Sequence, residues 1–140
     1  MHLKFFLLGW LLLVPAIVFA APVVELSQIA GKAKGDVAKV LGEPDSVSQT
    51  KSGEKAHYKK GDIEIVFVNG KADWITVSAM GDVPFSPAAL TVLGLKESPP
   101  SFKNANVIRW QGIPGFVEIA VFPGHKNCDY AYIEVLTRTK

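Results

Sequence analysis

The chain has 140 residues and a net charge of +2, from 15 basic and 13 acidic side chains, and 49% of its residues are hydrophobic. Its lysines are scattered along the chain, whereas nucleic-acid-binding proteins gather basic residues into a patch or stripe, so nucleic acid is not an expected partner. Cys128 is the single cysteine, which excludes an intramolecular disulfide and leaves the apolar core to stabilise the fold.

The first twenty residues have the pattern of a secretory signal peptide. Lys4 precedes an apolar run over residues 5–14, and the small residues Val18 and Ala20 follow at positions suited to cleavage. We expect cleavage after Ala20, or after Ala21, giving a periplasmic or secreted protein with no stable membrane anchor. An uncleaved anchor helix is the alternative, but the run is short for the roughly 20 residues that span a bilayer.

The rest of the chain, residues 21–140, is predicted to form a single domain. Residues 26–30 are a helical or irregular lead-in. Val37, Val40 and Leu41 then stand at i, i+3 and i+4, which predicts a short amphipathic helix that stops at Gly42. A polar loop over residues 45–54 should follow the helix.

Residues 62–78 predict a β-hairpin after a strand at residues 55–60. Asn69-Gly70 supplies the positive φ angles that a two-residue turn requires, and this turn pairs Val68 with Lys71. Uninterrupted pairing would place two sets of side chains together on the core side of the hairpin. They are Ile63, Ile65 and Phe67 on the first strand and Thr76, Trp74 and Ala72 on the second.

The same order of elements recurs in the second half. Residues 40–42, Val-Leu-Gly, return as residues 92–94 after 52 residues, and Trp110 follows Tyr58 by the same interval. The interval becomes 54 residues where Ile-Glu-Ile at 63–65 matches Val-Glu-Ile at 117–119. A fixed offset of this kind indicates an internal duplication.

The predicted fold is therefore α+β, built from two degenerate repeats. Each repeat is a short helix plus a three-stranded antiparallel meander, with the helices packed on one face of the sheet. Repeat one covers about residues 26–78, residues 79–85 form a linker, and repeat two covers about residues 86–136. A loop rich in Pro, Ser and Asn over residues 96–106 follows the second helix.

One set of motif residues resembles a known pattern. These residues are Gly31, Val37, Leu41-Gly42, Pro44, Tyr58, Phe67 and Asn69-Gly70-Lys71. The pattern is similar to that of the SmpA/OmlA small outer-membrane assembly lipoproteins and of the β-lactamase inhibitor protein. The resemblance implies helices packed on an antiparallel sheet and a protein-binding role. The chain departs from the family in having Ala33 where a capping Thr or Ser is usual, and in lacking the lipid-anchoring cysteine.

The second predicted strand pair, residues 116–122 and 130–136, suggests a binding face. If Phe122 lies opposite Tyr130, then Glu118 lies opposite Glu134, and alternate residues such as Tyr132 share their side of the sheet. Opposed carboxylates destabilise each other, and a basic or mixed protein surface would relieve that repulsion on docking. The predicted binding residues are Glu64, Glu118, Tyr130, Tyr132 and Glu134.

A weaker alternative places a site near His125 and Cys128, as in a small periplasmic enzyme or ligand-binding protein. His-x-x-Cys supplies only two of the four ligands of a structural zinc site. Cys128 is expected in a loop, where its thiol would contribute little to the stability of the fold. We therefore expect no catalytic residue, no metal and no cofactor. The favoured function is an exported non-catalytic module that binds another protein, as an envelope-assembly accessory or an inhibitor of a secreted enzyme.

Overall fold

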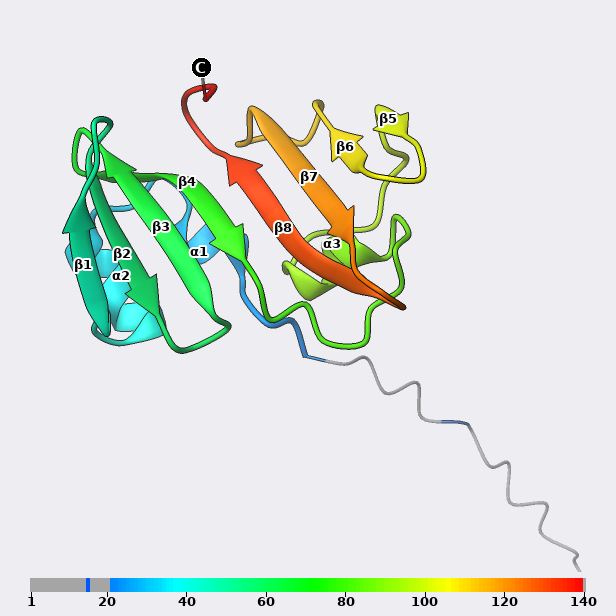
Figure 1. Cartoon of the computed structure of the whole chain (residues 1–140), viewed down its shortest axis with the longest axis horizontal. Coiled ribbons are helices and arrows are strands. Elements are labelled where there is room, and N and C mark those ends of the chain that lie inside the picture. The colour runs from blue at the N-terminus through cyan, green and yellow to red at the C-terminus, as the bar shows by residue number, and fades with distance from the viewer. Residues whose placement is uncertain (1–14, 16–20, 140) are drawn as a thin grey trace, which may run out of the picture.

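A computed structural model describes residue 15 and residues 21–139, so the predicted signal peptide lies outside the described residues. The described chain forms one eight-stranded antiparallel sheet with three short helices (Figure 1). The α+β class is confirmed. The elements are α1 (Leu26–Ile29), α2 (Lys34–Leu41), β1 (Ser46–Gln49), β2 (Glu54–Tyr58), β3 (Ile63–Val68), β4 (Lys71–Val77), α3 (Ala89–Val92), β5 (Phe102–Lys103), β6 (Ile108–Trp110), β7 (Glu118–Pro123) and β8 (Cys128–Glu134).

The strands follow the order β1-β2-β3-β4-β8-β7-β6-β5, so two four-stranded meanders meet where β4 pairs with β8. The prediction of three strands in each half was wrong, because β1 and β5 lie within the two segments expected to be loops. Both are edge strands with no buried residue. They therefore lack the alternation of apolar and polar residues by which a half-buried strand is recognised.

The predicted amphipathic helix is α2. Val37 and Leu41 are its buried residues, and Asp36 lies in its first turn, where the helix dipole favours a negative charge. Gly42 ends the helix with a φ of 83°, a conformation that costs glycine little because it has no Cβ. Among the described residues, no helix is long and apolar enough to cross a membrane.

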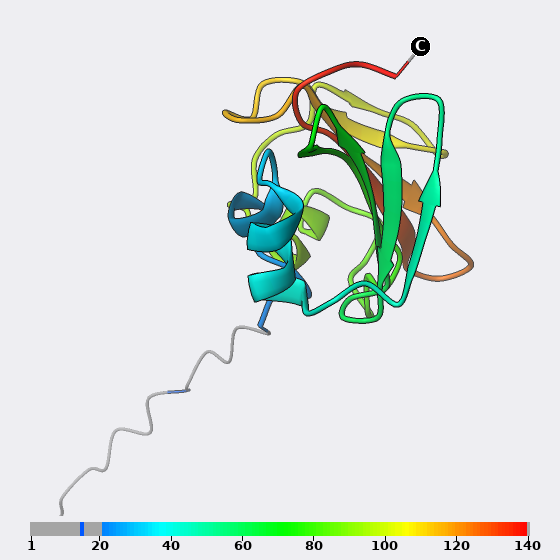
Figure 2. The same cartoon turned by 90° about the vertical axis from the view of Figure 1, so that its left-hand side faces the viewer.

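The core is one apolar cluster that joins the helices to the sheet. Leu26, Val37 and Leu90 from the helices belong to the same cluster as the inward-facing residues of the central strands, including Ile75 and Ile133. Figure 2 shows the helices gathered on one side of the strands. Side chains on the other side of the sheet are therefore free to form a surface.

A β-bulge in β4 overturns the predicted facing of the first hairpin. Phe67 pairs with Ala72, but the next residue, Val66, pairs with Trp74, so Asp73 has no partner of its own on β3. The extra residue shifts every later side chain of β4 to the opposite face. Trp74 and Thr76 consequently leave the predicted core side, and Ile75 and Val77 are buried in their place.

Candidate binding face

We call the sheet surface opposite the buried strand residues the outer face. Its side chains alternate with the core residues along β2, β3, β4, β7 and β8, and most of them are only half-buried. They are Lys55, His57, Glu64, Val66, Trp74, Thr76, Glu118, Phe122, Tyr130, Tyr132 and Glu134. All five predicted binding residues therefore lie on this face.

The predicted register of the second strand pair is confirmed. Phe122 lies opposite Tyr130 and Glu118 opposite Glu134. The rings of Phe122 and Tyr130 stack with their centroids 4.6 Å apart and their planes 16° from parallel. Stacked rings of this kind hold each other in place, so Tyr130 offers a surface that is already ordered.

Each of the opposed carboxylates has partners within the chain, which the sequence did not predict. Gln111 donates a hydrogen bond of 2.7 Å to Glu118, and the guanidinium groups of Arg109 and Arg138 approach that carboxylate to 3.6 and 3.8 Å. Glu134 accepts hydrogen bonds from the amide and the hydroxyl of Thr139. The face therefore does not need a partner's cation to relieve this repulsion.

Glu64 joins the other predicted residues through a row of paired side chains. It lies opposite Thr76 on β4, and Thr76 lies opposite Tyr132 on β8. Lys55 forms an ion pair of 3.5 Å with Glu64. Burial raises the pKa of the Tyr132 phenol, which is held within the sheet surface. The row runs across the junction of the two meanders.

Trp74 is the larger of the two outer-face residues, with Thr76, that the sequence assigned to the core side. It lies directly opposite Glu134, and its indole nitrogen donates a hydrogen bond of 3.1 Å to the carbonyl of Thr137. A recess of 520 Å³ opens beside the ring. The residues that line it are Ser52, Val68, Trp74, Thr137, Arg138 and Thr139. Because the recess combines an aromatic wall with hydroxyls and a guanidinium, it suits a side chain with apolar and polar parts.

His57 forms a separate charged cluster on the same face. Its Nδ1 lies 2.6 Å from the Asp45 carboxylate, and its Nε2 lies 2.7 Å from that of Asp62. The hydrogen bond that Asp62 accepts, followed by the one that Asp45 accepts, raises the pKa of His57. The bond with His57 in turn lowers the pKa of Asp45. The imidazole thus links Asp45, which precedes β1, to Asp62, which lies between β2 and β3. Because both ring nitrogens are hydrogen-bonded, neither is free to bind a metal.

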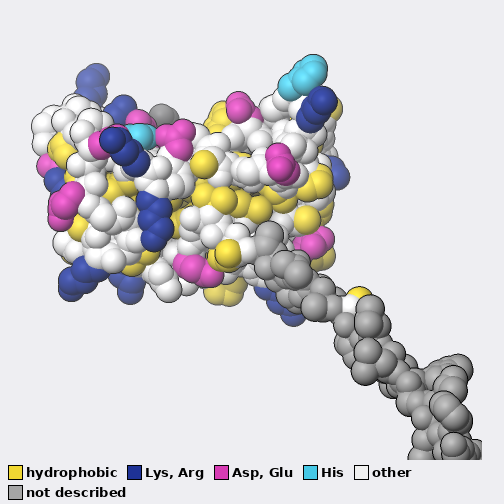
Figure 3. Space-filling model, turned by 90° about the horizontal axis from the view of Figure 1, so that it is seen from below, with side chains coloured by type: hydrophobic (Ala, Val, Ile, Leu, Met, Phe, Trp, Pro, Cys, Tyr) yellow, Lys and Arg dark blue, Asp and Glu magenta, His cyan; other side chains and the backbone are white. Residues whose placement is uncertain are grey.

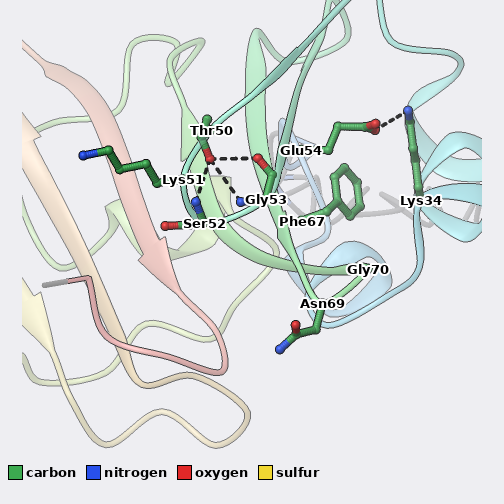
Figure 4. Close-up of a pocket in the computed structure, with 9 residues that line it drawn as sticks. All are labelled: Lys34, Thr50, Lys51, Ser52, Gly53, Glu54, Phe67, Asn69 and Gly70. Carbon is green, nitrogen blue, oxygen red and sulfur yellow. Dashed lines mark hydrogen bonds and ion pairs between the residues drawn. The ribbon is translucent and has the colours of Figure 1, made fainter.

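A second recess, of 480 Å³, lies beside the turn of the first hairpin (Figure 4). Lys34 and Glu54 form an ion pair at one side, and the Phe67 ring points into the recess. The Thr50 hydroxyl accepts hydrogen bonds from the amides of Ser52 and Gly53. Lys34, Glu54 and the Thr50 hydroxyl are thus each engaged with another group of the recess.

The alternative site near His125 and Cys128 does not form a shared cluster. Cys128 is the first residue of β8 and is buried in the core, contrary to the expected loop position, and its thiol donates to the carbonyl of Pro84 at 3.3 Å. Burial raises the pKa of this thiol, which keeps it protonated and unreactive. His125 is exposed in the connection before β8. Within residue 15 and residues 21–139, no group of three or more metal-binding side chains occurs.

The surface at the lower side of the molecule mixes charge and apolar groups. Figure 3 shows acidic and basic side chains interspersed there, with apolar side chains between them. A recess of 410 Å³ is lined by Ala21, Val23, Met80, Val83, Thr91 and Val92, together with Gly81 and Asp82. It lies where the described domain begins, away from the outer face.

Comparison of the sequence with protein-family models, with curated proteins and with solved structures finds no match. The resemblance to the SmpA/OmlA and inhibitor pattern therefore stays a prediction carried by the motif residues alone.

Proposed function

We propose that this chain is an exported, non-catalytic module that binds another protein on its outer face. The observation that carries the proposal is the half-buried aromatic group of Trp74, Tyr130 and Tyr132, which lies across the junction of the two meanders among paired charges. Large rings held in place provide contact area at little cost in conformational entropy, which is why Trp and Tyr are frequent anchors of interfaces.

The partner surface is expected to be mixed rather than simply basic. The Glu118 carboxylate is already paired with Arg109 and Arg138, so the face presents both signs of charge at its centre. A complementary partner would bring an apolar or amphipathic side chain to the recess beside Trp74 and polar groups to its rim. Such a surface fits either an envelope-assembly accessory or an inhibitor of a secreted enzyme, and the signal-peptide pattern supports export.

We propose further that the two meanders are degenerate repeats, each with its helices on the same side of the sheet. The strand order supports this, because each half runs from an edge strand, β1 or β5, to a central strand, β4 or β8, so β4 and β8 occupy equivalent places. Tyr58 and Trp110, which the sequence offset pairs, are both buried at the ends of equivalent strands. The proposal fails if the backbones of β2–β4 and β6–β8 do not superpose in the same order.

The binding proposal is tested by capturing the partner from an envelope extract and then measuring its affinity for variants. Tyr132→Ala is expected to weaken binding about tenfold or more, the size of effect typical of an aromatic anchor. Lys39→Ala is the control, because Lys39 is exposed on α2. Equal affinities of Tyr132→Ala and the parent, with both proteins folded by circular dichroism, would contradict the outer-face assignment.

A further inference from the structure

The free edge of β1 is a second surface of this molecule, separate from the outer face. β1 pairs with β2 on one side only and ends the sheet, and all four of its residues are exposed. Val47, in its middle, is 48% exposed, which places it among the few large exposed apolar side chains of the described chain. Figure 2, which faces this edge, shows the helices to one side of the strands.

The hydrogen-bond pattern identifies which backbone groups face outward. Thr50 donates to the carbonyl of Gly53 across the β1–β2 connection. Since residues of an antiparallel strand alternate between bonding one neighbour and the other, Ser48 and Ser46 bond β2. The amides and carbonyls of Val47 and Gln49 are therefore the groups that point to the free edge.

This edge lacks the features with which proteins usually block strand addition. Its sequence, Ser-Val-Ser-Gln, contains no charge and no proline, and its pairing with β2 runs without a bulge. The opposite edge differs: β5 has only two residues, one of them Lys103, and it follows Pro99 and Pro100. The two ends of one sheet are thus unequal, and β1 is the end that is left open.

We propose that β1 pairs antiparallel with β1 of a second copy of this chain, which joins the two sheets edge to edge. The outward-facing groups are self-complementary: with Ser48 opposite Ser48 of the second copy, Val47 lies opposite Gln49 of that copy, and both bond through their free amides and carbonyls. The same pairing brings Asp45, which precedes the strand, beside Lys51 of the second copy, which follows it, and the Asp45 carboxylate then lies between Lys51 and its hydrogen-bond partner His57.

The terminal charges favour a second copy over an unrelated peptide, because self-pairing places Asp45 opposite Lys51 at both ends of the joined strands. The interface is small, since it consists of one short strand and its flanking residues. Contacts of this size belong to weak and transient complexes. The dimer should therefore form reversibly and depend on protein concentration.

Sedimentation velocity over a concentration series of the purified protein tests the proposal. The parent is expected to approach twice its monomer mass at high concentration. Val47→Pro removes one edge-facing amide without touching the β2 ladder, so it should weaken dimerisation at least tenfold at an unchanged melting temperature. Lys103→Pro makes the matching change on β5 and should leave the dimer intact. A parent that stays monomeric, or a dimer that Val47→Pro does not affect, overturns the proposal.

Cross-linking tests the register. In the proposed pairing Ser48 faces itself as a pair without backbone hydrogen bonds, where the Cα atoms are about 4.5 Å apart, a spacing that a disulfide spans. Oxidised Ser48→Cys is expected to run as a dimer on a non-reducing gel, and Ser46→Cys is expected to remain a monomer. Equal cross-linking of the two variants would overturn the register, and binding of a foreign peptide to a monomeric chain would overturn self-pairing.

Discussion

The Asp73 carboxylate accepts two hydrogen bonds from Thr137, one from the Thr137 amide at 3.0 Å and one from the Thr137 hydroxyl at 2.7 Å. The same carboxylate accepts the amide of Leu136 at 2.8 Å, and only 1% of Asp73 is exposed. The bulge in β4 thus turns an acidic residue inward to bind the segment that follows β8. This contact fixes the tail against Trp74 and shapes the recess beside the ring.

Loss of the Asp73 carboxylate should destabilise the domain. Asp73→Ala would leave the amides of Leu136 and Thr137 and the Thr137 hydroxyl without their acceptor, and we expect a loss of about 3 kcal/mol in the free energy of unfolding, measured with urea. Thr137→Val removes only the hydroxyl bond and should cost about 1 kcal/mol. If Asp73→Ala unfolds at the same urea concentration as the parent, the tail contacts contribute no stability.

The hydrogen bonds of His57 with Asp45 and Asp62 should make the stability of the fold depend on pH. The folded-state pKa of His57 is raised, so its contribution is complete below its ordinary value and is lost as the pH rises through the raised pKa. The pKa of Asp45 is lowered, so its contribution is lost only as the pH falls through that lowered value. The cluster therefore stabilises the fold most at pH values above the ordinary pKa of Asp45 and below the ordinary pKa of His57.

His57→Gln tests this dependence by thermal unfolding. The difference in melting temperature between the parent and the variant is expected to be larger at about pH 5.5 than at about pH 9. His125→Gln, which alters an exposed loop histidine, provides the comparison and should show no such difference. A gap between parent and His57→Gln that grows with pH would contradict the assignment.

Two glycines should respond in opposite directions to alanine. A Cβ at Gly53 would lie 1.9 Å from the carbonyl oxygen of Phe67, so Gly53→Ala must push the β1–β2 loop away from β3 and should cost on the order of 3 kcal/mol. Gly35 lies in α2 with nothing within 4 Å of an added Cβ. Gly35→Ala should therefore stabilise by up to about 1 kcal/mol, as expected for a helix. Chemical denaturation measures both, and a stable Gly53→Ala variant would mean that the loop is free to move.

Substitution of Cys128 should lower the free energy of unfolding by more than a loop position would imply. The thiol is buried in the core and donates to the carbonyl of Pro84. Cys128→Ala removes that bond and leaves a small cavity, and we expect a loss of about 1 kcal/mol in urea unfolding rather than a change within about 0.5 kcal/mol. Thiol labelling of the native protein should be slow and should become fast in denaturant. Rapid native labelling would show that the thiol is accessible.

The sequence by itself determined the features whose causes are local. Asn69 and Gly70 take positive φ angles of 52° and 76°, and the two-residue turn they form connects β3 to β4 in the predicted hairpin. Once Phe122 was taken to lie opposite Tyr130, the alternation along β7 and β8 was enough to place Glu118 opposite Glu134. Turn geometry and strand period act between neighbouring residues, so they can be read without knowing the rest of the fold.

Only the tertiary structure decided which face Trp74 occupies. The bulge that moves it depends on Asp73 binding a segment 63 residues further along the chain, and no local pattern records such a contact. Burial of Cys128 likewise depends on Pro84, 44 residues before it. The edge strand β1 can be recognised only from its pairing with β2. All four of its residues are exposed, so they show no alternation of apolar and polar residues that would predict a strand. Pairing between distant segments thus determines which residues form the outer face and the open edge. The local alternation of apolar and polar residues predicted only some of them.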